Sequence, residues 1–452
     1  MTSTSPAPAP KLGHAGLHTL SVSLISVVVG FGQSILIARA LGNPANSGPY
    51  NLALATASLA ALVLGLSLPA GATYAVARRR ADPGALARWL LVWSVVQCAI
   101  AAIVFLVIRG SGLGDALLPV SLGLAAIPPV ALIVAGTASA NGPRGILYGK
   151  QRIITANYSD LAGGIATPFA MIVAVIVGVA IGSRYLALAF LWCVAFGFAV
   201  TAGRNIWMLR RDLRELGGNP DLRVVLSFSL PAHAANLVQF LNYRLDLFLV
   251  SAFLCATTLA PVGIYALAAA LAQLLWLMAQ SAASVLAPRV ASELDMPGEI
   301  GIRSAQVARF VFYATVAGAI VAATVGRALI PVIYGDSFRE AQLPFLLLLP
   351  GITGFSVATV LAAHISGSGR PFLNLIGSSV ALLVTLVLDL MLIPTMGVPG
   401  AAIASSASYL TTVMVTLAIF WRMTGISPLR VLLPTRSDLA LARRLLARLA
   451  PD

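Results

Sequence analysis

Long apolar runs alternate with short hydrophilic segments along the chain, and this pattern predicts twelve membrane-spanning helices. About 20 helical residues cross the hydrocarbon core of a bilayer, and each run is about that long or longer. The first run has the length of a span rather than of a signal peptide, so we predict no cleaved leader. The predicted spans are residues 19–38, 52–77, 89–108, 116–139, 158–181, 185–207, 227–253, 261–287, 307–330, 343–366, 372–393 and 399–421.

Two short sequence patterns each occur twice, and these echoes divide the spans into two sets of six. The pattern GxYxLA occurs at Gly48–Ala53 and Gly263–Ala268, at the start of the second span of each set. The pattern GxxR occurs at Gly149–Arg152 and Gly367–Arg370, between the fourth and fifth spans. An even number of helices per set makes the repeat parallel, about an axis along the membrane normal.

We therefore predict an all-α polytopic membrane protein with 12 transmembrane helices in two six-helix lobes, related by a parallel pseudo-two-fold repeat. Such an architecture sets two lobes around a central cleft and transports by rocking one lobe against the other. The predicted domains are a disordered cytoplasmic tail at 1–18, an N-lobe at 19–208, a cytoplasmic linker at 209–226, a C-lobe at 227–425 and a basic amphipathic tail at 426–452.

Composition and charge agree with a membrane protein and give it an orientation. Hydrophobic residues make up 59% of the chain and charged residues only 10%, which leaves too little polar surface for a soluble protein of this size. The net charge of +14 lies mostly in short segments on one side of the predicted spans. The positive-inside rule explains this asymmetry and places both termini in the cytoplasm, so the basic balance does not indicate nucleic-acid binding.

The span at 227–253 differs from the others because it carries polar side chains. A charged side chain near the centre of a membrane helix costs about 2.5 to 3.5 kcal/mol, so such residues usually face a bundle interior or a watery cavity. At 100° per residue one sector of this helix is polar, with His233 and Arg244 beside it. We predict that this face lines a translocation pathway. The sector contains Asn236, Gln239, Asn242, Tyr243 and Asp246.

The ionisable residues of this span need partners from other helices. Arg244 and Asp246 are two positions apart and do not face each other on a helix. Asp389, the other acid deep in a span, is one candidate partner for Arg244, which would leave Asp246 free to take a proton or a cation. His233 is a candidate proton switch, because histidine is the side chain that ordinarily changes charge near neutral pH. The alternative for all four is a structural role.

Other conspicuous residues are assigned simpler roles. Tyr50 and Tyr265 are expected to anchor at the outer interface, as aromatic side chains do. Gly163 and Gly164 are expected to allow close helix packing. Pro69 is expected to kink its helix. No metal-ligand spacing, nucleophile motif or nucleotide-binding loop is present in the sequence.

The chain resembles the polysaccharide-biosynthesis, O-antigen type of lipid-linked oligosaccharide flippase, in the multidrug/oligosaccharidyl-lipid/polysaccharide (MOP) exporter superfamily. The matching segments are PVGIYALAAALAQ at 261–273, APRVAS at 287–292, VIYGDSFREA at 332–341, SGSGRPFLN at 366–374 and MGVPGAAIA at 396–404. The resemblance implies a bacterial inner-membrane flippase that moves an undecaprenyl-pyrophosphate-linked oligosaccharide to the outer leaflet. It implies a proton or sodium gradient as the driving force, with no cofactor and no enzymatic activity.

Two differences between this chain and the family that it resembles narrow the range of expected cargo. Such flippases are expected to line their cavity with several basic residues, whereas Arg244 alone lies well inside a span, so a neutral or weakly charged glycan fits better. The first span offers only Arg39, at its outer end, which disfavours a peptidoglycan precursor. The predicted partners are the lipid-linked glycan, membrane lipids and polysaccharide polymerase machinery, and the predicted state is a monomer. The alternatives are an ion-coupled drug exporter, a membrane glycosyltransferase or polymerase, and a non-transporting scaffold.

Overall fold

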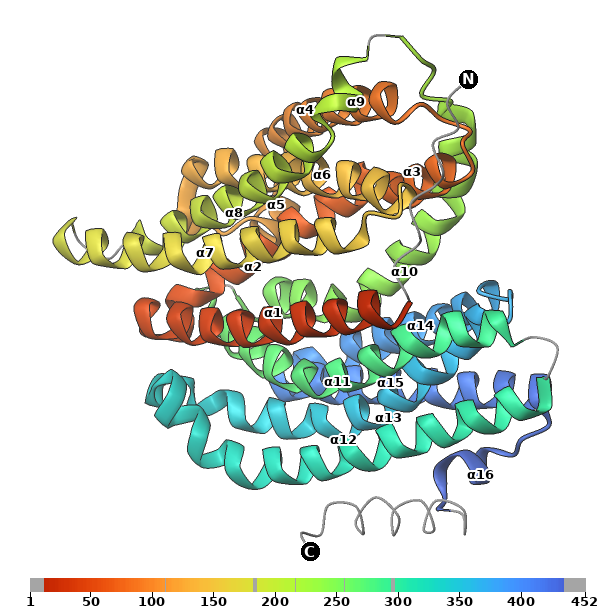
Figure 1. The fold of residues 1–452 in the computed structure, drawn as a ribbon. Helices are drawn as coiled ribbons and strands as arrows, with labels where there is room; N and C mark the ends of the chain where they lie inside the picture. The colour runs from red at the N-terminus through yellow and green to blue at the C-terminus, as the bar shows by residue number, and fades with distance from the viewer. Residues whose placement is uncertain are drawn as a thin grey trace, which may run out of the picture. The chain divides into compact units, whose positions relative to one another are not determined.

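A computed structural model describes residues 12–109, 111–181, 185–215, 217–255, 257–293 and 297–434. These residues are nearly all helical (Figure 1). Among them, 11 helices are long and apolar enough to cross a membrane, and the apolar stretch Ile25–Leu41 supplies a shorter one. The multi-pass, all-α prediction is confirmed, and the predicted count of twelve is close. Residues 435–452 of the predicted basic amphipathic tail lie outside the described residues. Residues 12–18, which the sequence assigned to a tail, are helical.

By internal contacts the chain divides into two compact units. Unit 1 comprises Met1–Leu237 and Thr257–Gly263, and unit 2 comprises Val238–Ala256 and Ile264–Asp452. The boundary falls inside α10 (Leu222–Leu254), whereas the sequence analysis placed it in the preceding linker. The other elements of unit 1 are α1 (Leu12–Leu41), α2 (Pro44–Gly65), α3 (Leu68–Ala77), α4 (Pro83–Ile108), α5 (Gly112–Leu117), η1 (Val120–Ala126), α6 (Ile127–Gly149), α7 (Ile153–Ile181), α8 (Leu186–Met208) and α9 (Arg210–Arg214).

Unit 2 begins with the second half of α10 and contains the remaining helices. Only the start of α11, up to Gly263, is assigned to unit 1. The elements are α11 (Ala260–Ser292), α12 (Pro297–Tyr334), η3 (Asp336–Ala341), α13 (Gln342–Gly367), α14 (Phe372–Met396), α15 (Val398–Thr424) and α16 (Pro428–Leu432).

The two units repeat the same packing pairs. In unit 1, α4 packs on α6, α6 on α8, and α7 on α8. In unit 2 the corresponding helices pair in the same way: α12 packs on α13, α13 on α15, and α14 on α15. The GxxR echo marks equivalent turns, because Gln151 and Gly369 are both left-handed, with φ of 59° and 76°. The repeat inferred from short motifs therefore extends to the fold.

The glycines of this second echo perform the same task in each unit. A Cβ on Gly149 would meet Val76 at the end of α3, and a Cβ on Gly367 would meet Val290 near the end of α11. Each glycine thus lets the fourth helix of its set approach the second closely. The shared motif is a packing requirement that both units have to satisfy.

One predicted span is broken in two. Residues 52–77 were expected to form a single helix, but α2 ends at Gly65 and α3 starts at Leu68. Between them Leu66 and Ser67 are left-handed, with φ of 48° and 49°. Pro69, in the first turn of α3, lacks the N–H that a continuous helix would use there, which favours the interruption.

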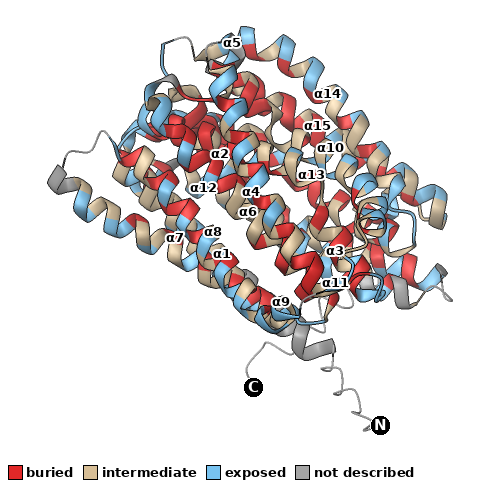
Figure 2. Ribbon diagram, turned by 90° about the horizontal axis from the view of Figure 1, so that it is seen from above, coloured by how far each residue is buried: buried red, intermediate tan, exposed pale blue. Residues whose placement is uncertain are grey.

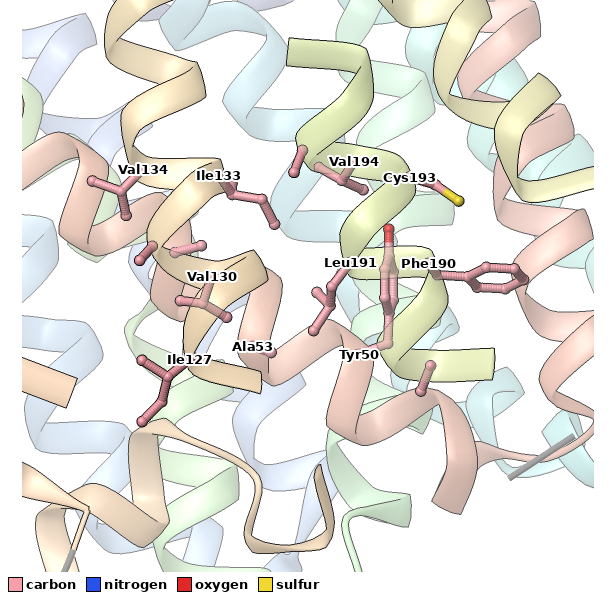
Figure 3. Close-up of a cluster of buried hydrophobic side chains, with 14 of the residues drawn as sticks. Tyr50, Ala53, Ile127, Val130, Ile133, Val134, Phe190, Leu191, Cys193 and Val194 are labelled. Carbon is pink, nitrogen blue, oxygen red and sulfur yellow. The ribbon is translucent and has the colours of Figure 1, made fainter. Parts of the chain in front are cut away.

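Burial follows the helix faces that meet other helices (Figure 2). One core of unit 1 gathers the ring of Tyr50 from α2, Ile133 from α6 and Phe190 from α8 (Figure 3). Large apolar side chains cover outward faces, among them Val107 at 76% and Val332 at 68% exposure. In water such surfaces would be costly, whereas lipid tails solvate them without penalty.

The glycine pair in α7 supplies a matched test of helix packing. A Cβ on Gly163 would collide with Thr201 and with the Gly197 carbonyl of α8, whereas Gly164 has nothing within 4 Å. Gly163→Ala is expected to destabilise the protein by about 1 to 3 kcal/mol through overpacking. Gly164→Ala is expected to be neutral or slightly stabilising, because alanine costs less conformational entropy in a helix. Thermal melting of the two purified variants measures the difference, and equal melting temperatures would contradict the close crossing of α7 and α8.

Candidate functional site

A buried carboxyl group, Asp246 of α10, lies at the centre of a polar cluster in unit 2. Its side chain is only 2% exposed. The Tyr265 hydroxyl of α11 and the Ser405 hydroxyl of α15 both donate to Oδ2 of Asp246, the latter at 2.7 Å. The Leu247 N–H donates to Oδ1 at 2.8 Å. Three helices therefore converge on one carboxylate.

A second buried acid lies close to the first. Asp389 of α14 is fully buried, and neither of its carboxyl oxygens has a hydrogen-bond partner among the described residues. Thr385, one helical turn earlier, is 1% exposed, and its hydroxyl is also unpartnered there. Asp246 and Asp389 interact electrostatically with each other. Two buried carboxyl groups are thus close enough to influence each other.

The predicted pair of Arg244 with Asp389 is absent. Within the described part of the chain, no ion pair includes Arg244, Asp246 or Asp389. Arg244 is half-buried on α10 and acts on Asp246 only through a longer-range electrostatic attraction. The oxygens of Asp246 accept three hydrogen bonds, and its uptake of a proton or a cation stays a prediction. The helical period gave the face of each residue on its own helix but not which neighbouring helix it meets.

The other predicted polar residues of α10 in unit 2 organise a ring cluster and a helix contact. Gln239 donates to the Tyr243 hydroxyl at 3.0 Å, and Asn242 donates to the Ser378 carbonyl of α14 at 2.7 Å. The Tyr243 ring lies 5.1 Å from that of Trp276, between ring centres. The rings of Phe355 and Tyr409 complete this aromatic cluster.

The remaining predicted residues belong to unit 1. Asn236 is exposed, and its amide donates to the Ser67 hydroxyl at 2.9 Å. His233 has a buried Nδ1 without a partner among the described residues. Arg39 is exposed in the last turn of α1. None of these three belongs to the Asp246 cluster of unit 2.

Two residues of the site, Tyr265 and Ser405, were missed in the sequence. Tyr265 was expected at the membrane interface, but it is 2% exposed and bonds Asp246. Tyr50, its counterpart in the repeat, is equally buried and meets the ring of Phe190 edge-on, 6.2 Å between centres. The repeated GxYxLA pattern could have indicated this shared burial. A tyrosine that occurs at the same position of both repeats is better explained by a common packing role than by anchoring at the membrane surface.

The arrangement can bind a cation or a proton. Burying two carboxylates without a positive partner is expensive, and a proton or a bound cation between them removes that cost. Oxygen atoms from Asp246, Asp389 and Ser405 are the donor type that hard cations prefer. Among the described residues, no cluster of three or more His, Cys, Asp or Glu side chains suits a transition metal. These oxygen atoms therefore suit a proton or a small hard cation.

The multi-pass helical fold is similar to that of solved membrane transporters, among them a MATE family transporter of the MOP superfamily. A family model described as a polysaccharide biosynthesis protein matches residues 157–343, a segment that contains Asp246 and Tyr265. A search of curated proteins finds no sequence match. The resemblance inferred from the motifs is thus supported by an independent family match.

Solved transporter structures share the fold over most of the chain. The lipid II flippase MurJ in an inward closed conformation has a TM-score of 0.73 at 12% identity, covering 96% of this chain and 93% of its own. An inward-facing MATE family multidrug transporter has a TM-score of 0.68 at 14% identity, covering 90% and 97%. The bent form of the Vibrio cholerae MATE transporter VcmN gives 0.59 at 13% identity, covering 91% and 97%. At these identities the comparison shows the fold and leaves the cargo open.

Proposed function

We propose that this protein is a flippase that carries a lipid-linked oligosaccharide from the inner to the outer leaflet of a bacterial inner membrane. The observation that carries the proposal is the polysaccharide-biosynthesis match, because it covers the segment with the unusual polar helix. The charge asymmetry supports cytoplasmic termini. The transporter fold supports a non-enzymatic role. Membrane lipids and a polysaccharide polymerase are the proposed partners of a monomer.

The proposed mechanism is ion-coupled alternating access. Similar folds have been solved in inward-facing and outward-facing conformations of MATE transporters, which supports a rocking cycle. The Asp246 and Asp389 pair would take up a proton or sodium ion and release it in the other state, because each state changes how well the pair is solvated. Arg244 is the proposed contact for the pyrophosphate, since guanidinium groups bind phosphate oxygens in a fork.

The direct test is a flipping assay in proteoliposomes. A fluorescent undecaprenyl-pyrophosphate oligosaccharide is loaded into both leaflets, and a membrane-impermeant reductant reports the fraction that moves. The proposal expects flipping by the full-length protein that responds to an imposed proton or sodium gradient. Empty-liposome rates under every gradient would refute it.

Arg244 provides the sharpest variant for cargo binding. Arg244→Ala is expected to reduce flipping at least about tenfold, because a charged hydrogen bond is worth about 1.5 to 3 kcal/mol. Arg223→Ala, at the exposed start of the same helix, is the matched control and is expected to flip normally. The measurement is initial flipping rate at equal protein content. Equal rates for both variants would remove Arg244 from cargo recognition.

Export of amphipathic cations is the second candidate. The aromatic cluster of Tyr243, Trp276, Phe355 and Tyr409 favours it, because aromatic faces attract cations. The same proteoliposomes loaded with ethidium discriminate the two. Gradient-driven ethidium efflux without glycan flipping would favour the exporter.

A further inference from the structure

The break between α2 and α3 lines a cavity in unit 1 that no part of the ion site uses. Leu66 and Ser67 adopt left-handed backbone there, and non-glycine residues pay about 1 to 3 kcal/mol for such conformations. Within a membrane, non-helical backbone persists only where protein buries it or where it lines a polar cavity. The interruption therefore needs neighbouring groups that hold it open.

Hydrogen bonds to three other helices hold the broken segment. The Trp93 indole N–H of α4 donates to the Leu64 carbonyl at 3.2 Å, a group near the end of α2. Asn236 donates to Ser67 at 2.9 Å. Thr73 of α3 donates to the Gly145 carbonyl of α6 at 2.9 Å. These hydrogen bonds stabilise the interrupted backbone between α2 and α3.

The cavity has a volume of about 260 Å³, and its lining is uncharged and mostly apolar, with a few hydrogen-bonding groups. Its hydrogen-bonding residues are Ser67, Gln97, Thr137, Asn141 and Asn236, and the Trp93 side chain contributes an aromatic wall. No charged side chain lines it among the described residues. Drug-sized ligands occupy pockets of about 300 to 1,000 Å³, so this one holds a single ring rather than a whole oligosaccharide.

One lining residue has an unmet hydrogen-bonding need. Gln97 of α4 is 1% exposed, and its buried Oε1 has no partner in the described part of the chain. Leaving a buried acceptor unsatisfied costs about 1 to 3 kcal/mol, so a donor supplied by a ligand would bind there with advantage. Two positions in the first turn of α3 offer an anion no free backbone donor. Pro69 has no N–H, and the Ala70 N–H already donates to the Ser67 carbonyl.

We propose that this cavity is a binding subsite for one uncharged pyranose ring of the glycan cargo. A pyranose offers hydroxyl donors and acceptors around its edge for the amides and hydroxyls, and a C–H face for the indole of Trp93. The inference rests on the proposed flippase function and deepens it, because it assigns sugar recognition to unit 1. The lack of cationic groups selects neutral sugars over uronic acids.

The test measures binding of methyl glycosides to the full-length protein in lipid nanodiscs. Saturation-transfer NMR with methyl glucoside, galactoside, mannoside and N-acetylglucosaminide reports contact, and methyl glucuronide is the charged comparison. At least one neutral glycoside is expected to bind more tightly than the glucuronide. Gln97→Leu is expected to weaken that binding about tenfold, the loss of one buried hydrogen bond. No binding by any neutral glycoside, or unchanged binding by Gln97→Leu, would overturn the proposal.

Two threonine variants distinguish a loss of glycoside binding at the cavity from a general loss of folding. Thr137 lines the cavity and Thr167 does not, although both hydroxyls donate to a carbonyl one turn earlier in their own helices, at 2.7 Å and 3.0 Å. Thr137→Val is expected to weaken glycoside binding and Thr167→Val to leave it unchanged. Equal effects of the two would also overturn the subsite.

The flipping assay separates this proposal from the function on which it rests. If wild-type protein flips the glycan lipid and Gln97→Leu does so with the same half-saturating substrate, the subsite fails while the flippase stands. If neutral glycosides bind through Gln97 but no glycan lipid is flipped, the subsite stands and the flippase fails.

Discussion

Asp246→Asn is expected to lower glycan flipping at least about tenfold and to remove its response to a proton or sodium gradient. Asparagine keeps the shape of the side chain and an oxygen that Tyr265 and Ser405 can reach, but it neither carries charge nor releases a proton. Charged hydrogen bonds are worth about 1.5 to 3 kcal/mol, which corresponds to roughly 10- to 100-fold. The measurement is flipping rate against imposed gradients and against pH.

Three further variants separate coupling from simple loss of structure. Asp389→Asn is expected to share the phenotype, because the two acids act on each other. Asp160→Asn is the control, since this acid of α7 is ion-paired with Arg144 at 2.8 Å, so its loss is expected to leave the gradient response unchanged. Tyr265→Phe tests the hydroxyl without changing ring packing. If Asp246→Asn inserts normally and keeps the wild-type gradient and pH dependence, the residue has no part in coupling.

Replacing Gly48 or Gly263 by alanine is expected to destabilise the protein by about 1 to 3 kcal/mol or more. A Cβ on Gly48 would meet the backbone carbonyl of Leu259, and a Cβ on Gly263 would meet the backbone carbonyl of Pro44. Leu259 lies four positions before Gly263, and Pro44 lies four positions before Gly48. Each glycine therefore contacts the turn that precedes the other glycine. Backbone atoms cannot rotate away as a flexible side chain would, and the helices must separate. The measurement is the melting temperature of purified protein.

A double variant makes this prediction specific to the crossing. Gly48→Ala with Gly263→Ala is expected to cost less than the sum of the single changes, because the first separation already makes room for the second Cβ. Gly32→Ala in α1 is the control, since nothing lies within 4 Å of its Cβ position. Strict additivity, or single variants as stable as Gly32→Ala, would show that α2 and α11 do not approach so closely.

The sequence was a good guide to features that depend on one helix at a time. Span lengths follow from the thickness of the bilayer, so the long apolar runs predicted nearly all of the membrane helices. The GxYxLA and GxxR echoes predicted the repeat, because helix crossings and turns in equivalent places need the same small residues. Where backbone strain entered, at Leu66 and Ser67, the hydropathy pattern gave no sign, and one expected helix became two.

The candidate site was predicted only in part, for a physical reason visible at Asp246. The cost of burying charge identified Asp246 and Asp389 from the sequence, since that cost depends only on residue type and depth. Their hydrogen-bond partners depend on which helices pack together, and helical periodicity carries no such information. Tyr265 and Ser405 are ordinary residues in their own helices and gain a role only where α10, α11 and α15 converge.

By itself the sequence determined the membrane class, most of the helical spans, the internal repeat and the buried acids, because each follows from local hydropathy, recurring short motifs or residue type. The tertiary structure alone decided which groups satisfy Asp246, that Arg244 and Asp389 do not pair, and that the α2–α3 break surrounds a neutral cavity. Contacts between residues distant in sequence set these features, since several helices must meet before a polar group acquires its partners.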